Sequence, residues 1–122
     1  MTHKEFGDFG EKFAQKYLEK KKYKIIETNY RIKSAEIDII AYDKNTLCFI
    51  EVKSRSSDLF GLPCEAVDVK KQQKIINGAM WYIAQNGIES EIRFDVVEIF
   101  ATEKNDKLKV KKINIIKNAF TN

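Results

Sequence analysis

Two short runs in the first half of the chain carry charged residues in a pattern suited to chemistry. Glu36-Ile37-Asp38 and Glu51-Val52-Lys53 lie in two predicted neighbouring strands, and in each run the charged residues are two positions apart. Residues two apart point to the same face of a strand. If the turn between the strands is centred on Lys44-Asn45 and its loop has an even length, Asp38 lies directly opposite Glu51. An odd loop would send the two carboxylates to opposite faces.

Two carboxylates placed opposite each other on antiparallel strands repel unless a proton or a cation lies between them, because their Cβ atoms are only about 4.5 to 5.5 Å apart. Oxygen ligands at this spacing suit Mg²⁺ or Mn²⁺. Lys53 shares the face of Glu51, where it would orient or deprotonate an attacking water or stabilise charge developing on phosphorus. The pattern therefore predicts metal-assisted phosphodiester hydrolysis.

The alternative is an exposed cross-strand charge network, in which Glu36 opposite Lys53 is an ordinary ion pair of little energetic value. Against it, both strands are apolar almost throughout, so both faces of the sheet are expected to be covered. Carboxylates in such strands cost free energy unless they serve a purpose. Asp95 raises the same question in a later strand, and an internal pair with Arg93 is the favoured interpretation there.

The elements that must position these residues follow from hydrophobic periodicity. Apolar residues at three- and four-residue steps predict helices, and β-branched or aromatic runs predict strands; the first three strands should form an antiparallel meander. A loop between the third strand and the second helix is expected to border the site. The expected order is helix 4–22, strands 23–32, 36–42 and 46–53, loop 54–63, helix 67–84 ending near Asn86-Gly87, and strands 93–100 and 107–116 joined by 102–106.

The first helix offers another acid to the site. Gly7, Glu11, Ala14 and Leu18 follow one stripe, on which Gly7 would permit close approach to the sheet. Glu11 either joins the carboxylates or lies solvated at the edge of the buried stripe.

Several other residues have both a structural and a functional interpretation. Lys70, Lys71 and Lys74 in the second helix form either a solvated face or a phosphate contact beside the loop. Trp81 and Tyr82 are expected to pack in the core rather than to stack on bases. Cys48 is interpreted as a core thiol and Cys64 as a loop residue.

Composition limits the class of protein. The 122 residues form one expected domain; 43% are hydrophobic and 33% charged, as in soluble globular proteins. A net charge of +4 and a pI near 9.0 favour an anionic partner, with nucleic acid ahead, while only three arginines argue against sequence-specific base reading. Two isolated cysteines exclude a disulfide framework or a zinc knuckle. No apolar run approaches the roughly 20 residues of a membrane helix, and the first residues lack the apolar core of a signal peptide, so we expect a cytoplasmic protein without membrane contact.

The ordered set of motifs resembles the YraN-like family of small bacterial proteins, a branch of the PD-(D/E)xK nuclease superfamily that is similar to archaeal Holliday-junction resolvases. The resemblance spans nearly the whole chain. Two residues depart from the pattern: Ala35 stands where the family usually has glycine, and Ile37 where the superfamily has proline. The residues that carry the resemblance are Gly10-Glu11, Asn29-Tyr30-Arg31, Glu36-Ile37-Asp38, Phe49 to Lys53 with Arg55, Phe60-Gly61, Glu65-Ala66-Val67 and Arg93 to Val97.

The resemblance implies a single α/β domain with a restriction-endonuclease-like α-β-β-β-α-β-β core, in which helices flank a central mixed sheet. It implies Asp38, Glu51 and the Val52 carbonyl as ligands of Mg²⁺ or Mn²⁺. Lys53 would be the catalytic lysine, and Glu11 would contact a water of the metal shell. Arg31, Arg55 and Lys71 match polar positions of the pattern and are assigned to phosphate binding.

The expected function is a metal-dependent endonuclease acting on structured or single-stranded DNA without sequence specificity. A homodimer would suit cleavage of both strands of a junction. The alternative is a non-catalytic nucleic-acid-binding or adaptor module with a protein partner in a DNA-processing assembly, because fold and motif do not establish activity. Hydrolysis of a small phosphate compound is disfavoured, since the chain has no glycine-rich phosphate loop.

Overall fold

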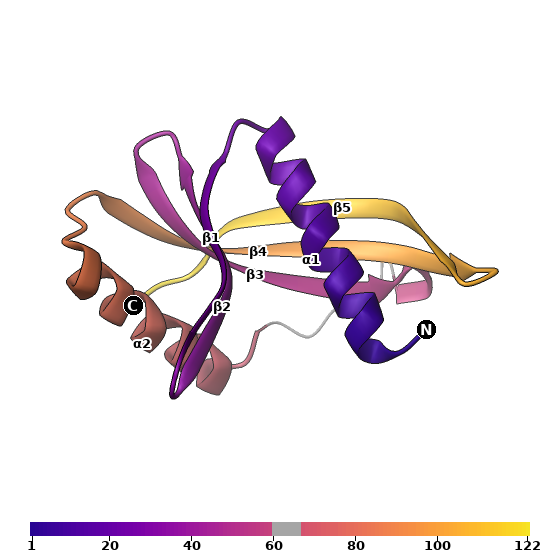
Figure 1. Ribbon diagram of the computed structural model, residues 1–122, viewed down its shortest axis with the longest axis horizontal. Helices are drawn as coiled ribbons and strands as arrows, with labels where there is room; N and C mark the ends of the chain where they lie inside the picture. The colour runs from indigo at the N-terminus through magenta and orange to yellow at the C-terminus, as the bar shows by residue number, and fades with distance from the viewer. Residues whose placement is uncertain (60–66) are drawn as a thin grey trace.

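A five-stranded mixed sheet with a helix on each face forms the α/β domain (Figure 1). The computed structural model describes residues 1–59 and 67–122. The expected order of helices and strands is confirmed, and a short 3-10 turn, η1, follows the third strand. The elements are α1 (His3–Lys20), β1 (Lys24–Ile32), β2 (Ala35–Asp43), β3 (Thr46–Ser56), η1 (Ser57–Leu59), α2 (Val69–Asn86), β4 (Glu91–Lys104) and β5 (Lys107–Phe120).

The strands lie in the order β1-β2-β3-β4-β5, and every neighbouring pair is antiparallel except β3 and β4, which are parallel. The predicted meander of the first three strands is confirmed. Pairing of β2 with β3 runs from Asp43 opposite Thr46 to Ile39 opposite Ile50, which is the register of an even-length loop. Asp38 and Glu51 are the next residues of the two strands, just beyond the last pair.

The two helices cover opposite faces of the sheet and bury separate hydrophobic clusters. Ala14 and Leu18 of α1 pack on residues such as Ile39 and Ile50. On the other face α2 packs through a buried stripe that includes Ile75 and Ala79. Figure 1 shows α1 lying across the strands and α2 set apart from it. Among the described residues, no helix is long and apolar enough to cross a membrane.

Helix α2 begins and ends as its sequence suggests. Asp68 is the N-cap and accepts a hydrogen bond from the Lys71 N–H, and Gly87 ends the helix in the left-handed conformation, with φ of 60°. Tyr82 is buried as expected, with ring contacts to Tyr30 and Phe49. The expectation that Trp81 packs in the core is wrong: its side chain is 54% exposed, because it lies on the helix face turned away from the sheet.

Strand β3 is longer than the sequence predicts. Residues 54–56, expected in the loop, continue the strand because they pair with the parallel strand β4 as far as Ser56 opposite Ala101. The rest of the expected loop, from residue 60, and Cys64 lie outside the described residues. Strands β4 and β5 are also longer than predicted, since only Asn105 and Asp106 form the turn between them, both with positive φ, a geometry suited to a tight hairpin.

The pairing of Arg93 with Asp95 is confirmed, and it belongs to a larger network. The Asp95 carboxylate is 1% exposed and accepts hydrogen bonds from the Arg93 guanidinium at 2.8 Å and from the Asn118 N–H at 2.9 Å. The same guanidinium donates to Asp43 and to the Tyr23 hydroxyl. This buried charge is therefore fully partnered, as structural charges in a core must be. Cys48 lies free and buried in the core, as expected.

Helix α1 comes close to β3 at Gly10. A Cβ atom on Gly10 would lie 1.8 Å from the Ser54 Oγ and 3.1 Å from its Cβ, whereas a Cβ on Gly7 would meet nothing within 4 Å. The prediction that Gly7 permits the close approach is therefore wrong by one helical turn. The Gly10 contact seats α1 against β3, and the next residue, Glu11, is carried toward the site.

We predict that Gly10→Ala lowers the free energy of unfolding by about 1–3 kcal/mol, because the added methyl group overlaps Ser54. Ser54→Ala should relieve most of this loss, so urea unfolding of the four proteins in a double-mutant cycle should show favourable coupling. Gly7→Ala is the matched control and should raise stability by about 0.5–1 kcal/mol, as expected for a helix-interior glycine with free space around it. Additive effects of the Gly10 and Ser54 changes would contradict this packing.

Candidate active site

Asp38 lies where the side chains of β2 stop alternating regularly between the two faces of the sheet. Ile37 and Ile39 are two residues apart, yet they pack into clusters on opposite faces of the sheet. Between the pairs Thr28–Ile39 and Tyr30–Ile37, the β1 residue Asn29 has φ of 51°, a conformation that kinks a strand. The break turns the Asp38 side chain toward β3.

The Asp38 carboxylate takes the place of a backbone hydrogen bond between β2 and β3. Its Oδ2 accepts a hydrogen bond from the Val52 N–H at 2.8 Å, just beyond the last residue pair of the two strands. The N–H and C=O of one strand residue point to the same edge, so the Val52 carbonyl faces the same gap. The gap between the strands is thus bordered by a carboxylate and a backbone carbonyl.

Glu51 completes a pair of buried carboxylates in this gap. Asp38 is 9% exposed and Glu51 is 8% exposed. Burial, followed by the hydrogen bond to Asp38 and the negative charge of that group, raises the pKa of Glu51 to about 8. The Lys71 ammonium counteracts this effect only in part, since its Nζ lies 3.5 Å from Oε2 of Glu51.

The Glu51 Oε2 is the one buried side-chain oxygen or nitrogen without a hydrogen-bond partner in residues 1–59 and 67–122. Lys71 forms an ion pair with this atom at 3.5 Å, and no hydrogen bond to it is formed. A buried, unsatisfied carboxylate oxygen costs free energy, so its retention calls for an explanation such as an ion that binds there.

Glu11 reaches the same group of acids from α1. Burial and then the neighbouring Asp38 charge raise the pKa of Glu11 to about 7. Asp38 therefore interacts with Glu11 on one side and with Glu51 on the other. Among the described residues, no three Asp, Glu, His or Cys side chains gather closely enough to hold one ion together.

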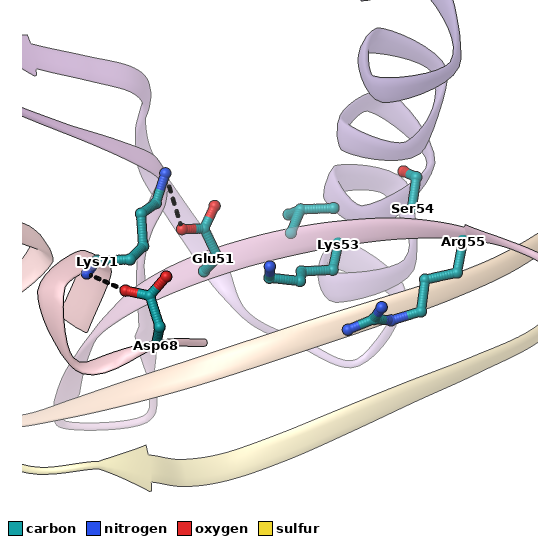
Figure 2. Close-up of a pocket in the computed structure, with 7 residues that line it drawn as sticks. Glu51, Lys53, Ser54, Arg55, Asp68 and Lys71 are labelled. Carbon is teal, nitrogen blue, oxygen red and sulfur yellow. Dashed lines mark hydrogen bonds and ion pairs between the residues drawn. The ribbon is translucent and has the colours of Figure 1, made fainter. Parts of the chain in front are cut away.

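A cleft of about 800 Å³ opens beside Glu51, and three cationic side chains of the described residues line it together with the carboxylates of Glu51 and Asp68. Figure 2 shows Lys53 and Arg55 extending from one side of β3, while Ser54 points to the other side, toward α1. Lys53 is half-buried, and Arg55 pairs with Glu98 at 3.2 Å. Lys71 and Asp68, at the start of α2, close the cleft opposite β3.

The predicted phosphate-binding residues divide between this cleft and the surface. Arg55 and Lys71 line the cleft, whereas Lys70 and Lys74 are exposed on α2. Arg31 is not among the lining residues; it pairs with Glu36 across β1 and β2 at 3.4 Å. Glu36 therefore has Arg31 as its partner and does not form the ion pair with Lys53 that the alternative interpretation required.

One residue that lines the cleft, Asp68, was not predicted from the sequence as part of the site. Asp68 was placed inside the predicted helix, but it is the N-cap and its carboxylate lies at the mouth of the cleft. An aspartate directly before a run of helix-forming residues is the signal that would have identified it.

The donor atoms in the gap fit a hard divalent cation. Mg²⁺ and Mn²⁺ prefer oxygen ligands and are commonly held by one or two carboxylates, completed by water and substrate oxygens. Asp38 and Glu51 offer two carboxylates, and the oxygen of Glu51 that has no hydrogen-bond partner is available for coordination.

Comparison with known proteins places the chain among relatives of the same length. The family model "Uncharacterised protein family UPF0102" matches residues 10–99, which include every carboxylate and lysine of the site. The chain belongs to this family. The YraN-like resemblance is thereby confirmed. A UPF0102 protein of Clostridioides difficile is 51% identical over 98% of this chain and all of its own length. UPF0102 proteins of Caldanaerobacter subterraneus and Caldicellulosiruptor bescii are 49% and 48% identical, again over 98% of this chain and over 98% and 100% of their own lengths.

The raised pKa of Glu51 predicts how the stability of this UPF0102 protein depends on pH in the absence of divalent cations. The folded state favours the protonated carboxyl, so the stability due to this group is fully present below the ordinary pKa of 4.5 and is lost as the pH rises through about 8. Glu51→Gln should therefore raise the free energy of unfolding at pH 9 by about 1–3 kcal/mol, with a gain that shrinks toward pH 5.

Urea unfolding in EDTA at several pH values measures this gain. Glu19→Gln, a change at an exposed position of α1, is the control and should leave the pH dependence unaltered. Parallel pH profiles for wild type and Glu51→Gln would show that folding does not raise the pKa of Glu51.

Proposed function

We propose that this UPF0102 protein is a Mg²⁺- or Mn²⁺-dependent endonuclease that hydrolyses phosphodiester bonds in structured or single-stranded DNA. The observation that carries the proposal is the buried pair of Asp38 and Glu51 at the opening between β2 and β3, with one carboxylate oxygen lacking a hydrogen bond. Such a pair has a cost in stability, and a function that needs the unsatisfied oxygen would account for that cost.

Each side chain around the opening has a distinct role in this proposal. A bound divalent cation supplies positive charge to a phosphoryl oxygen and to the attacking water. Asp38, fixed by the Val52 N–H, and Glu51 would hold such a cation, and the Glu51 carboxyl would release its proton to solvent on binding it. Lys53 stabilises negative charge that develops on the phosphate.

Glu11 and the remaining cations serve proton transfer and substrate binding. With a pKa of about 7, Glu11 can both accept and release a proton near neutral pH, as a general acid or base must. Arg55 and Lys71 line the cleft and bind the flanking phosphates. Because these contacts go to the backbone, they position DNA without reading its sequence.

A non-catalytic DNA-binding or adaptor module is the second candidate. The observation that favours it is that no three ligand side chains meet at one point among the described residues, so the chain's own hold on a cation is limited to two carboxylates. This module would use the same cationic cleft and act through a protein partner.

We predict that Asp38→Asn lowers cleavage at least a hundredfold and leaves DNA affinity within a fewfold of wild type, since the carboxylate holds the cation and not the DNA. Lys53→Met should lower cleavage without weakening cation binding. The assay uses labelled single-stranded, duplex, flap and four-way-junction DNA with Mg²⁺, Mn²⁺ or EDTA.

Glu19→Gln, which removes one carboxylate from an exposed position of α1, is the control. It should cleave like wild type. Cleavage that survives in Asp38→Asn would refute the proposed site. Salt-sensitive DNA binding with no cleavage by any protein, under any metal condition, would favour the adaptor module.

A further inference from the structure

The charge of α2 differs from that of α1. Helix α2 has three lysines and no aspartate or glutamate, whereas α1 has four lysines and four acidic residues. A solvated helix usually mixes both signs to gain ion pairs between neighbouring turns. A helix with only positive charges is suited to an anionic partner.

The exposed face of α2 combines this charge with the chain's single tryptophan. Lys70, Lys74, Asn77 and Trp81 are separated by four, three and four residues, so they form one stripe, and all four are exposed. The next residue, Tyr82, is the aromatic residue that packs in the core here, and it is 6% exposed. The Trp81 side chain is 54% exposed, so much of the indole is accessible to a partner.

The stripe begins beside the cleft and runs away from it. Lys71 lines the cleft, and its neighbour Lys70 is the first residue of the stripe. Ten residues of helix separate Lys71 from Trp81, a distance of about 15 Å along the axis. A strand whose phosphate sits in the cleft can therefore continue along α2 and reach the indole; Figure 1 shows α2 on the periphery of the molecule.

We propose that the stripe of Lys70, Lys74, Asn77 and Trp81 binds a single nucleic-acid strand, with Trp81 stacked on an unpaired base and the two lysines on phosphates. Aromatic side chains combined with a cationic track are the means by which proteins bind single strands without sequence preference. The inference rests on the proposed function in one respect only: it names the form of substrate that the neighbouring cleft receives.

The composition of the stripe favours a single strand over other partners. In a duplex the faces of the bases are stacked on one another, so an indole on a convex helix has no face to contact. The centre of a protein interface is poor in lysine, whereas two of the four residues here are lysines.

Because the chain contains one tryptophan, its fluorescence reports this contact directly. The full-length protein is titrated in EDTA, so that no cleavage occurs, with an oligothymidylate of about a dozen nucleotides, close to the site size of single-strand binders. We expect quenching that saturates with the single strand and little quenching with a duplex of equal length. Trp81→Ala should weaken binding of the single strand roughly fivefold to a hundredfold, as measured by anisotropy, and Trp81→Phe should restore most of the affinity.

The lysines are tested with variants of equal charge change. Lys70→Gln with Lys74→Gln should reduce the slope of log affinity against log salt by about 1.4, because two phosphate contacts are lost. Lys12→Gln with Lys16→Gln removes two exposed lysines from α1 and should leave affinity for the oligonucleotide and the quenching nearly unchanged.

Three results would overturn the inference: single-strand binding without quenching, equal affinity in Trp81→Ala, or emission that shifts with protein concentration alone, which would make the stripe a contact between two copies of the chain. These outcomes are independent of the proposed activity. Quenching without any metal-dependent cleavage would refute the nuclease and support the stripe. Cleavage by Trp81→Ala, with wild-type affinity for the single strand, would support the nuclease and refute the stripe.

Discussion

The burial of Asp38 and Glu51 beside each other is the constraint around which the site is arranged. Burial, followed by the hydrogen bond to Asp38 and the charge of that group, raises the pKa of Glu51 to about 8, so charging both carboxylates costs free energy that a bound cation would offset. The gap exists because the β2–β3 ladder ends at Ile39 and Ile50, and because the Asp38 side chain, rather than backbone, bonds the Val52 N–H. Helix α1 adds Glu11 through the close contact at Gly10, and helix α2 adds Lys71.

A comparison within the same sheet shows why this pair points to function. Asp95 is more deeply buried than either site carboxylate, yet Arg93 and the Asn118 N–H satisfy its oxygens. Glu51 forms an ion pair with Lys71 at 3.5 Å, and its Oε2 has no hydrogen-bond partner. The first arrangement is what the stability of a core requires, and the second has a cost in stability that a bound ligand would remove.

Local sequence patterns predicted most of the fold and the placement of Asp38 beside Glu51. The order of elements followed from periodicity, and the register of Asp38 with Glu51 followed from the parity of a short turn. A long-range contact decided what could not be predicted about β3: parallel pairing with β4 extends the strand through Ser56. Arg31 forms an ion pair with Glu36 across the β1–β2 hairpin and does not line the cleft. Trp81 and Tyr82 are adjacent in the sequence, and only the seating of α2 determines which one is buried. The kink at Asn29 turns Asp38 into the gap. It depends on a positive φ at Asn29, which could not be predicted from the Asn-Tyr sequence alone.

The most direct test of the account is the number of protons released when Mn²⁺ binds, measured by calorimetry at pH 7 in buffers of different ionisation enthalpy. If the cation displaces the proton of Glu51, binding should release about one proton near pH 7 and progressively fewer as the pH rises above 8. Asp38→Asn and Glu51→Gln should each bind the cation much more weakly. Mn²⁺ binding that releases no proton, or that is unchanged in these two variants, would contradict the assignment of the buried pair as a cation site.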